Sequence, residues 1–227
     1  RDIFRVRPAH VLKIDANGTM TQRRYWSPRD VVPVRLKSDQ EYAEGLREKL
    51  DRAVRAQMRS AHTVGCLLSG GLDSSAVAAL AARALAQSNR RLTAYTGAAS
   101  GDFRGAPPPG HYADERPYVD AIARAAGNID VTYVSSDAGD DFAALEKFFI
   151  ALEGPVRNPT NLGWVLAILR RARQQGRRVL LGGLQGNHTI SWTGWSQTAG
   201  HLLRGRLLKA FRQWRLHYRR TPHTRWA

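Results

Sequence analysis

A glycine-rich loop stands between an apolar run and an alanine-rich stretch in the first half of the chain. The apolar run at 63–68 (TVGCLL) predicts a buried strand, and the stretch at about 74–88 predicts a helix. Gly70 and Gly71 allow the backbone to turn tightly and to approach a ligand closely. The first amides of the helix point to the same place, at its positive end. A strand, a glycine loop and a helix in this order predict an anion site at the end of the strand.

The polar side chains of this loop suggest which anion it holds. Ser69, Ser74 and Ser75 offer hydroxyl donors to a phosphate. Asp73 would repel a bare phosphate, so its carboxylate indicates a divalent cation, expected to be Mg²⁺, that also contacts the phosphates. The chain contains neither the Walker pattern nor the GxGxxG dinucleotide pattern. The structural alternative is a Gly-Ser turn that begins a helix, with Asp73 as an ordinary first-turn acid.

Strand and helix patterns alternate through the middle of the chain. The predicted elements are strands at 63–68, 92–96, 129–134 and 178–182 and helices at about 74–88, 115–127, 140–152 and 161–175. This alternation predicts a parallel α/β sheet that carries its ligands in the loops starting near Ser69, Gly97, Ser135 and Gly183. The Gly- and Pro-rich stretch 98–113 is predicted to be a surface loop that would serve as a lid.

The N-terminal part has a different pattern. Residues 10–15 and 19–26 flank Asn17-Gly18, which predicts a β-hairpin with a two-residue turn because both residues tolerate positive φ. Ser38 and Glu41 form a capping-box pattern at the start of a helix predicted over about 39–59. We therefore expect a hairpin and linker at 1–36 and one main domain at 37–227.

The charge is concentrated at one end of the chain. The net charge is +16, and positions 154–227 hold 14 basic and no acidic residues. Such a segment would suit binding to nucleic acid, nucleotide phosphates, an acidic substrate or a partner domain, or it would simply form a solvated helix face.

Cys66 lies in an apolar run and is expected to be a core residue. No run approaches the roughly 18 apolar residues of a membrane span, so no membrane partner and a cytoplasmic location are expected.

The loop 69–75 (SGGLDSS) resembles the pyrophosphate loop of the ATP pyrophosphatases, which cleave ATP to AMP and pyrophosphate to adenylate a substrate. Within that superfamily the chain resembles the asparagine synthetase B-type family over nearly its whole length. Residues 3–26 are similar to the segment after the family's glutaminase domain, and residues 42–83 to the helix, strand, loop and helix that follow. Asp114-Glu115 resembles the acidic pair that opens a later helix. The resemblance implies a Rossmann-like, adenine nucleotide α-hydrolase-like domain, with residues 1–36 as a hairpin remnant of a glutaminase-type domain.

The resemblance also assigns further site residues. Glu153 falls where the family places a glutamate near the reacting carbonyl, and it would act as general base if a dry pocket raised its pKa. The alternative for Glu153 is an ordinary carboxylate at a helix end. Gly183 and Gly186 lie in the stretch that replaces the family's loop ending in Asp-Glu, and they are expected to bind ATP or pyrophosphate.

That stretch departs from the family at two positions. Asn187 replaces an aspartate that helps to hold Mg²⁺ and pyrophosphate, and His188 replaces a glutamate. An amide still offers a donor to phosphate or a carbonyl to the metal, so Asn187 stays in the expected site. A lone histidine is more often structural than a ligand, and His188 is assigned no catalytic role.

The resemblance implies an ATP- and Mg²⁺-dependent ligase. A carboxylate, from aspartate or a related side chain, would become acyl-AMP, and ammonia or an amine would then attack it. A similar loop occurs in asparagine-synthetase-related proteins that include lasso peptide cyclases, so macrolactam formation is an alternative within this chemistry. A nucleic-acid-modifying or nucleic-acid-binding ATP pyrophosphatase is a second class, favoured by the basic C-terminal segment and its tryptophans. A nonenzymatic nucleotide-binding remnant is a third, favoured by Asn187.

Two parts of the family pattern are not recognised in the sequence. The glutaminase half begins with a cysteine nucleophile, whereas Arg1 falls within the linker and Cys66 within a strand. The helices and the lysine expected downstream of Trp192 are not recognisable either. We therefore expect a synthetase domain that is incomplete at its C-terminus and that receives ammonia from a missing glutaminase-like domain or partner.

Overall fold

The computed structural model describes residues 4–98, 114–135, 140–154, 161–192 and 197–220. The chain divides into two compact units, Arg1–Leu46 and Arg47–Ala227, and each is described by itself.

The first unit contains the predicted hairpin. Strands β1 (His10–Ile14) and β2 (Met20–Arg24) pair antiparallel, with Ile14 opposite Met20. The predicted two-residue turn is wrong. Asp15 N donates to Thr19 O at 3.1 Å, so residues 16–18 form a three-residue loop, in which only Gly18 has a positive φ (81°). The reason is the Asp15 side chain, because its Oδ1 accepts from the Asn17 and Thr19 amides at 2.9 Å each and stabilises the longer loop.

A short 3₁₀ helix, η1 (Pro28–Asp30), and then helix α1 (Asp39–Gln57) follow the hairpin. The Ser38 hydroxyl accepts from Glu41 N at 3.2 Å, as a capping box requires. The Glu41 carboxylate accepts from the amide of Lys37 at 2.8 Å, one residue earlier than the usual box partner. Both contacts satisfy backbone donors and fix the start of α1.

The second unit is built on a four-stranded parallel sheet with the order β5-β4-β3-β6. This confirms the predicted α/β class. Its elements are β3 (Val64–Leu67), α2 (Leu72–Ala86), β4 (Leu92–Gly97), α3 (Arg116–Ala126), β5 (Ile129–Val134), α4 (Asp140–Leu152), α5 (Leu162–Gln174), β6 (Val179–Leu181), η3 (Gly186–His188), α6 (Gln197–Leu203) and α7 (Leu207–Arg220).

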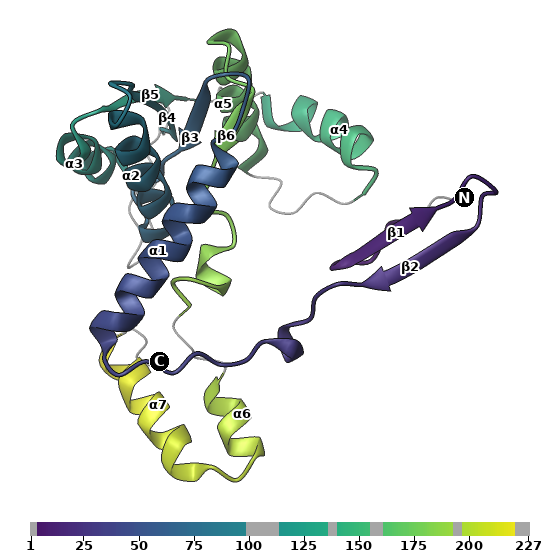
Figure 1. The fold of residues 1–227 in the computed structure, drawn as a ribbon. Coiled ribbons are helices and arrows are strands. Elements are labelled where there is room, and N and C mark those ends of the chain that lie inside the picture. The colour runs from purple at the N-terminus through teal and green to yellow at the C-terminus, as the bar shows by residue number, and fades with distance from the viewer. Residues whose placement is uncertain (1–3, 99–113, 136–139, 155–160, 193–196, 221–227) are drawn as a thin grey trace. The chain divides into compact units, whose positions relative to one another are not determined.

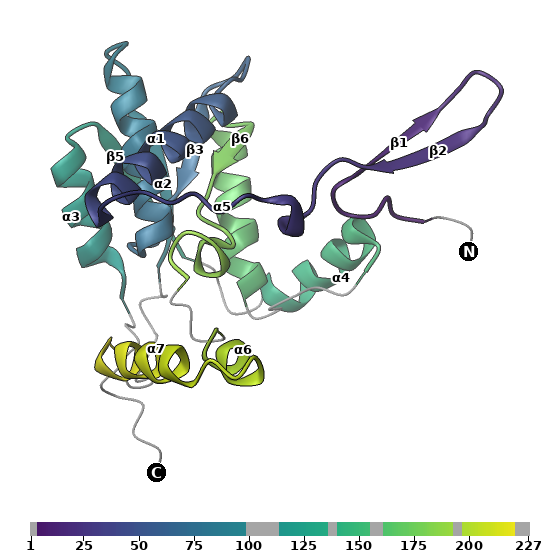
Figure 2. The ribbon, with the colours of Figure 1, turned by 60° about the horizontal axis from the view of Figure 1, so that its bottom comes forward.

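Helices cover both faces of this sheet, as Figures 1 and 2 show. Along β4, Leu92 and Ala94 belong to one apolar cluster and Tyr95 to another, as expected when successive side chains point to opposite faces. The first cluster includes residues of α2 and α3, and the second includes Ile168 and Ala172 of α5. The sheet is therefore the middle of three layers.

Cys66 lies in the first cluster and is fully buried, so its prediction as a core residue is confirmed. Burial raises the pKa of its thiol to about 12 because the charged thiolate loses its hydration. The thiol therefore stays protonated at neutral pH, and the reactive thiolate does not form. Cys66 therefore has a packing role.

The connections of the sheet place two loops next to each other. The crossover through α2 joins β3 to β4 on one side, whereas β6 pairs with β3 on the other side, with Val64 opposite Val179. The carboxyl ends of β3 and β6 thus form the point where the strand order reverses, which is where open α/β sheets bind ligands. The predicted lid at 98–113 lies outside the described residues except for its first residue.

Candidate functional site

The glycine loop leaves the carboxyl end of β3 and leads into α2. Gly70 has φ 72°, and a Cβ there would stand 2.8 Å from the Cβ of Tyr118 in α3. Both the conformation and the space therefore require glycine at this position. Gly71 is the N-cap of α2 and offers no side-chain cap, so the first amides of the helix keep donors for an external acceptor.

Hydroxyls within the loop hold its shape. The Ser74 hydroxyl accepts from Ser69 N at 3.2 Å, lies 3.0 Å from the Ser69 hydroxyl and donates to Gly71 O at 3.2 Å. Ser75 donates its hydroxyl to the same Gly71 carbonyl at 2.6 Å. Ser74 is buried and Ser69 is exposed. Two of the three predicted hydroxyl donors thus bond the loop backbone, while the exposed Ser69 hydroxyl contacts that of Ser74.

The loop after β6 packs directly on the start of α2. A Cβ at Gly183 would stand 2.5 Å from Ser74 N and 2.6 Å from the Asp73 carbonyl carbon. A Cβ at Gly186, which is buried, would overlap the carboxylate of Asp73. Gly183 and Gly186, both predicted site residues, therefore lie against Asp73. A side chain at either position would prevent this close contact.

The two oxygens of the Asp73 carboxylate have different surroundings. Oδ2 accepts a hydrogen bond from the Ser191 hydroxyl at 2.9 Å. Oδ1 is buried and has no hydrogen-bond partner among the described residues. A buried, unpaired carboxylate oxygen is costly unless a cation or donor satisfies it, so Oδ1 indicates a place for such a group.

Asn187 joins this cluster through Ser191, whose hydroxyl lies 3.2 Å from the Asn187 Oδ1. The side chains of Asn187 and His188 are exposed. The contact of Ser191 with Asp73 was not predicted from the sequence. Its one local signal is its position four residues after Asn187, within the same glycine-rich stretch.

Glu153 lies apart from this cluster. It is exposed, follows the end of α4 and has φ 49°, in the left-handed region. Within the described ranges, no hydrogen bond or ion pair joins Glu153 to the glycine loop, and residues 155–160 lie outside those ranges. Its catalytic role stays a prediction.

The acidic pair at the start of α3 borders the glycine loop. The carbonyl oxygen of Glu115 would lie 3.5 Å from a Cβ at Gly70, and burial raises the pKa of the Glu115 carboxyl. Asp114 instead accepts from the Arg116 guanidinium at 2.8 Å, a hydrogen bond that lowers the pKa of its exposed carboxyl. The pKa values of the two carboxyls are thus shifted in opposite directions, although both residues are exposed.

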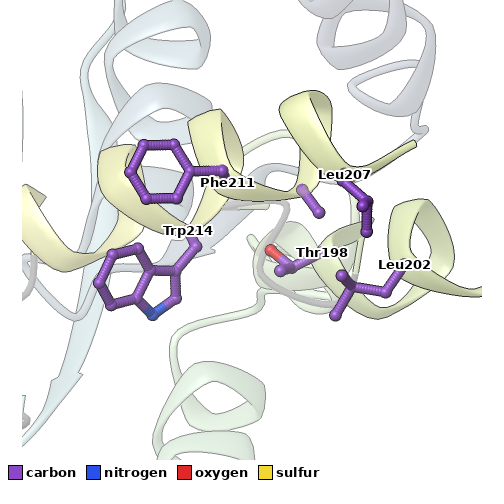
Figure 3. Close-up of a pocket in the computed structure, with 6 residues that line it drawn as sticks. Thr198, Leu202, Leu207, Phe211 and Trp214 are labelled. Carbon is purple, nitrogen blue, oxygen red and sulfur yellow. The ribbon is translucent and has the colours of Figure 1, made fainter. Parts of the chain in front are cut away.

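Apart from the glycine loop, a hollow lies between α6 and α7 (Figure 3). This groove of about 240 Å³ is lined by Thr198, Leu202, Leu207, Ala210, Phe211 and Trp214. None of the predicted site residues lines it, and its almost wholly apolar walls do not suit nucleotide phosphates.

In the part of the chain that the structure describes, no helix is long and apolar enough to cross a membrane.

The sequence of this chain is similar to those of known proteins. The sequence model of the family Asparagine synthase matches residues 45–214. The chain is 34% identical, over 161 residues, to a Mycobacterium bovis protein with the provisional name glutamine-hydrolyzing asparagine synthetase, covering 70% of this chain and 22% of that protein.

Two fungal relatives match a shorter stretch. The chain is 36% identical over 90 residues to amidase chry2 of Gibberella zeae, and 32% identical over 92 residues to amidase chyE of Penicillium rubens. These matches cover 39% and 40% of this chain and 13% and 14% of the relatives. The chain thus spans about a fifth or less of the length of the relatives it matches. With a family match over residues 45–214, the chain belongs to the asparagine synthase family.

Proposed function

We propose that this chain carries the ATP-using site of a ligase that adenylates a carboxylate and joins it to ammonia or an amine. The observation that carries the proposal is the Asp73 carboxylate, whose buried Oδ1 lacks a partner among the described residues. It lies between two glycine-rich loops at the start of α2. Membership of the asparagine synthase family supports ATP as the substrate that this place receives.

The residues at this place fit a magnesium ion. Asp73 Oδ1 is a hard oxygen ligand of the kind that Mg²⁺ prefers, and the Asn187 carbonyl is close enough to share Ser191 with Asp73. Among the described residues, no three acidic, histidine or cysteine side chains gather as a metal site. Asp73 would thus hold the ion together with phosphate oxygens, and the ion would neutralise charge on the leaving pyrophosphate.

The chain's own donors would orient the triphosphate. The amides at the start of α2 and the backbone of Gly70 and Gly71 present partial positive charge, and the Ser69 hydroxyl is exposed beside them. Ser74 and Ser75 keep this backbone in shape. Gly183 and Gly186 allow the second loop to approach, so that Asn187 faces the same ligand. A preorganised set of donors stabilises charge on pyrophosphate as it leaves.

The second half of the reaction needs a carboxylate substrate and an amine donor. We propose aspartate or a related side chain as the carboxylate, with ammonia from a glutaminase-like domain or partner. Glu153 would accept a proton from the attacking amine. Closure of a macrolactam is an alternative within the same chemistry. The names of the relatives refer to asparagine synthesis and to amides, which favours amide chemistry over the nucleic-acid alternative.

Incubation of the chain with ATP, Mg²⁺ and a suitable carboxylate is expected to release AMP and pyrophosphate, because a pyrophosphate loop holds the β- and γ-phosphates as the leaving group. Anion-exchange chromatography of the nucleotides measures this directly. Exchange of labelled pyrophosphate into ATP tests the adenylation step without an amine. Release of ADP in place of AMP would contradict the proposed chemistry.

Replacing Asn187 by aspartate is expected to tighten Mg²⁺ binding about tenfold in the presence of a nucleotide. The new carboxylate and Asp73 both lie beside Ser191, so the two would be no more than about 6 Å apart and would attract a shared cation. Without metal the same two charges repel, which should lower the free energy of unfolding by about 1 kcal/mol. Calorimetry and thermal melting, each with and without Mg²⁺, measure both effects. Unchanged Mg²⁺ affinity would show that Asn187 faces away from the ion.

A further inference from the structure

Ser191 is the residue through which the loop after β6 reaches the Asp73 carboxylate. Its partly buried hydroxyl donates to Asp73 Oδ2 at 2.9 Å and lies 3.2 Å from Asn187 Oδ1. The two bonded residues Asp73 and Ser191 are 118 positions apart in the sequence. The contact therefore depends on the pairing of β6 with β3.

A hydroxyl has a single proton, so Ser191 must choose between its two acceptors. A hydrogen bond to a charged carboxylate is stronger than one to a neutral amide, and the contact with Asp73 is also the shorter. Ser191 therefore satisfies Oδ2 of Asp73. This leaves Asp73 Oδ1 and the Asn187 carbonyl as the two oxygens without a donor from Ser191.

The Ser191 hydroxyl is not needed to close its own loop. The backbone already closes it, because Thr189 N and Ser191 N donate to Gly186 O at 2.9 and 3.1 Å. Thr189 adds a hydroxyl bond to Gln185 O at 3.1 Å. The Ser191 hydroxyl acts on the facing loop, and its removal should leave the fold of both loops in place.

We propose that Ser191 is a positioning residue for the metal-binding carboxylate. By donating to Oδ2, it fixes the rotation of the Asp73 side chain and keeps Oδ1 directed to the cation. This inference rests on the proposed function, because it requires that Asp73 hold a cation with bound nucleotide. It adds a role for a residue outside the glycine loop.

The test compares Ser191→Ala with Ser191→Thr and with a matched control, Thr189→Val, which removes a hydroxyl that bonds within the loop only. Binding of Mg²⁺ is titrated by calorimetry in the presence of a nonhydrolysable ATP analogue, and analogue binding is measured again without metal. We expect Ser191→Ala to weaken Mg²⁺ binding about tenfold, the size of a lost hydrogen bond to a charged group. Metal-free nucleotide binding should change less than about twofold. Ser191→Thr should restore most of the affinity, and Thr189→Val should retain it.

A double-mutant cycle with Asp73→Asn separates positioning from direct ligation. If Ser191 acts through Asp73, Ser191→Ala should have no further effect on Mg²⁺ binding in the Asp73→Asn background. Additive losses would make Ser191 a ligand in its own right and would overturn the inference. If Ser191→Ala does not fold, Ser191→Cys fills the same space with a much weaker donor and should show the same tenfold loss.

The outcomes also distinguish this inference from the proposed function. Failure of the unmodified chain to bind the nucleotide in a Mg²⁺-dependent way would reject the proposed function, and the inference with it. Mg²⁺-dependent binding by the unmodified chain, with equal Mg²⁺ affinity in Ser191→Ala, would reject the inference alone.

Discussion

The Gly186→Ala variant should weaken Mg²⁺-dependent nucleotide binding by at least about tenfold, the size of a lost hydrogen bond to the charged Asp73 carboxylate. The added Cβ would overlap the Asp73 carboxylate, and the nearest atoms that it would meet belong to that residue. Either the loop after β6 must withdraw or Asp73 must rotate, and both movements break the Ser191 contact. Overpacking of this kind should also lower the free energy of unfolding by about 1–3 kcal/mol.

Gly182→Ala is the matched control for this variant. It adds the same methyl group to the same turn, but its Cβ would meet the Leu67 side chain at an ordinary 3.6 Å. Calorimetry with an ATP analogue and Mg²⁺, together with thermal melting, should show a large loss for Gly186→Ala and little change for Gly182→Ala. Retained affinity in Gly186→Ala would mean that the two loops separate when nucleotide binds.

Asp73→Asn should reduce pyrophosphate exchange by roughly a hundredfold to a thousandfold, comparable with the loss of a preorganised electrostatic group in an active site. The amide has nearly the same shape and keeps an oxygen to accept the Ser191 hydrogen bond, so the loops should stay in place. The cation, however, loses the carboxylate charge. Nucleotide affinity should therefore respond to Mg²⁺ much more weakly than in the unmodified chain.

The control for Asp73→Asn is Asp114→Asn, which removes an exposed carboxylate paired with Arg116 at the start of α3. Mg²⁺ affinity in this control should match that of the unmodified chain, and melting temperatures should be similar for all three proteins. Equal Mg²⁺-dependent affinity in Asp73→Asn and the unmodified chain would remove Asp73 from the metal role and leave the helix amides as the main phosphate ligands.

The fold could be predicted because its signals are local. Short apolar runs alternate with helical periodicity, and each predicted strand from 63–68 to 178–182 has a counterpart in the parallel sheet. The error at the hairpin shows the limit of such signals. Asn17-Gly18 favours a two-residue turn, but the neighbouring Asp15 side chain bonds two loop amides and so stabilises a longer loop.

The candidate site likewise has one part that could be predicted from the sequence and one part that could not. The glycine loop is contiguous in sequence, so its residue types alone indicated an anion and a cation. The contact between Asp73 and Ser191 is not contiguous, because it depends on which strand lies next to β3. Alternation of elements predicts a parallel sheet but leaves the order of its strands open. Ser191 could be assigned only after the position of β6 was known.

The position of β6 beside β3 also determines when the site can form during synthesis. β6 is the last strand of the sheet in sequence, and it is three residues long. Ser191 leaves the ribosome 118 residues after Asp73, which is a delay of at least about 6 s at 20 residues per second. β3, α2 and β4 are synthesised before Ser191, and until then the Asp73 carboxylate has no Ser191 to hold it. Nucleotide binding at this site would therefore be a late event, and a ligand that contacts both loops would hold the final strand in the sheet.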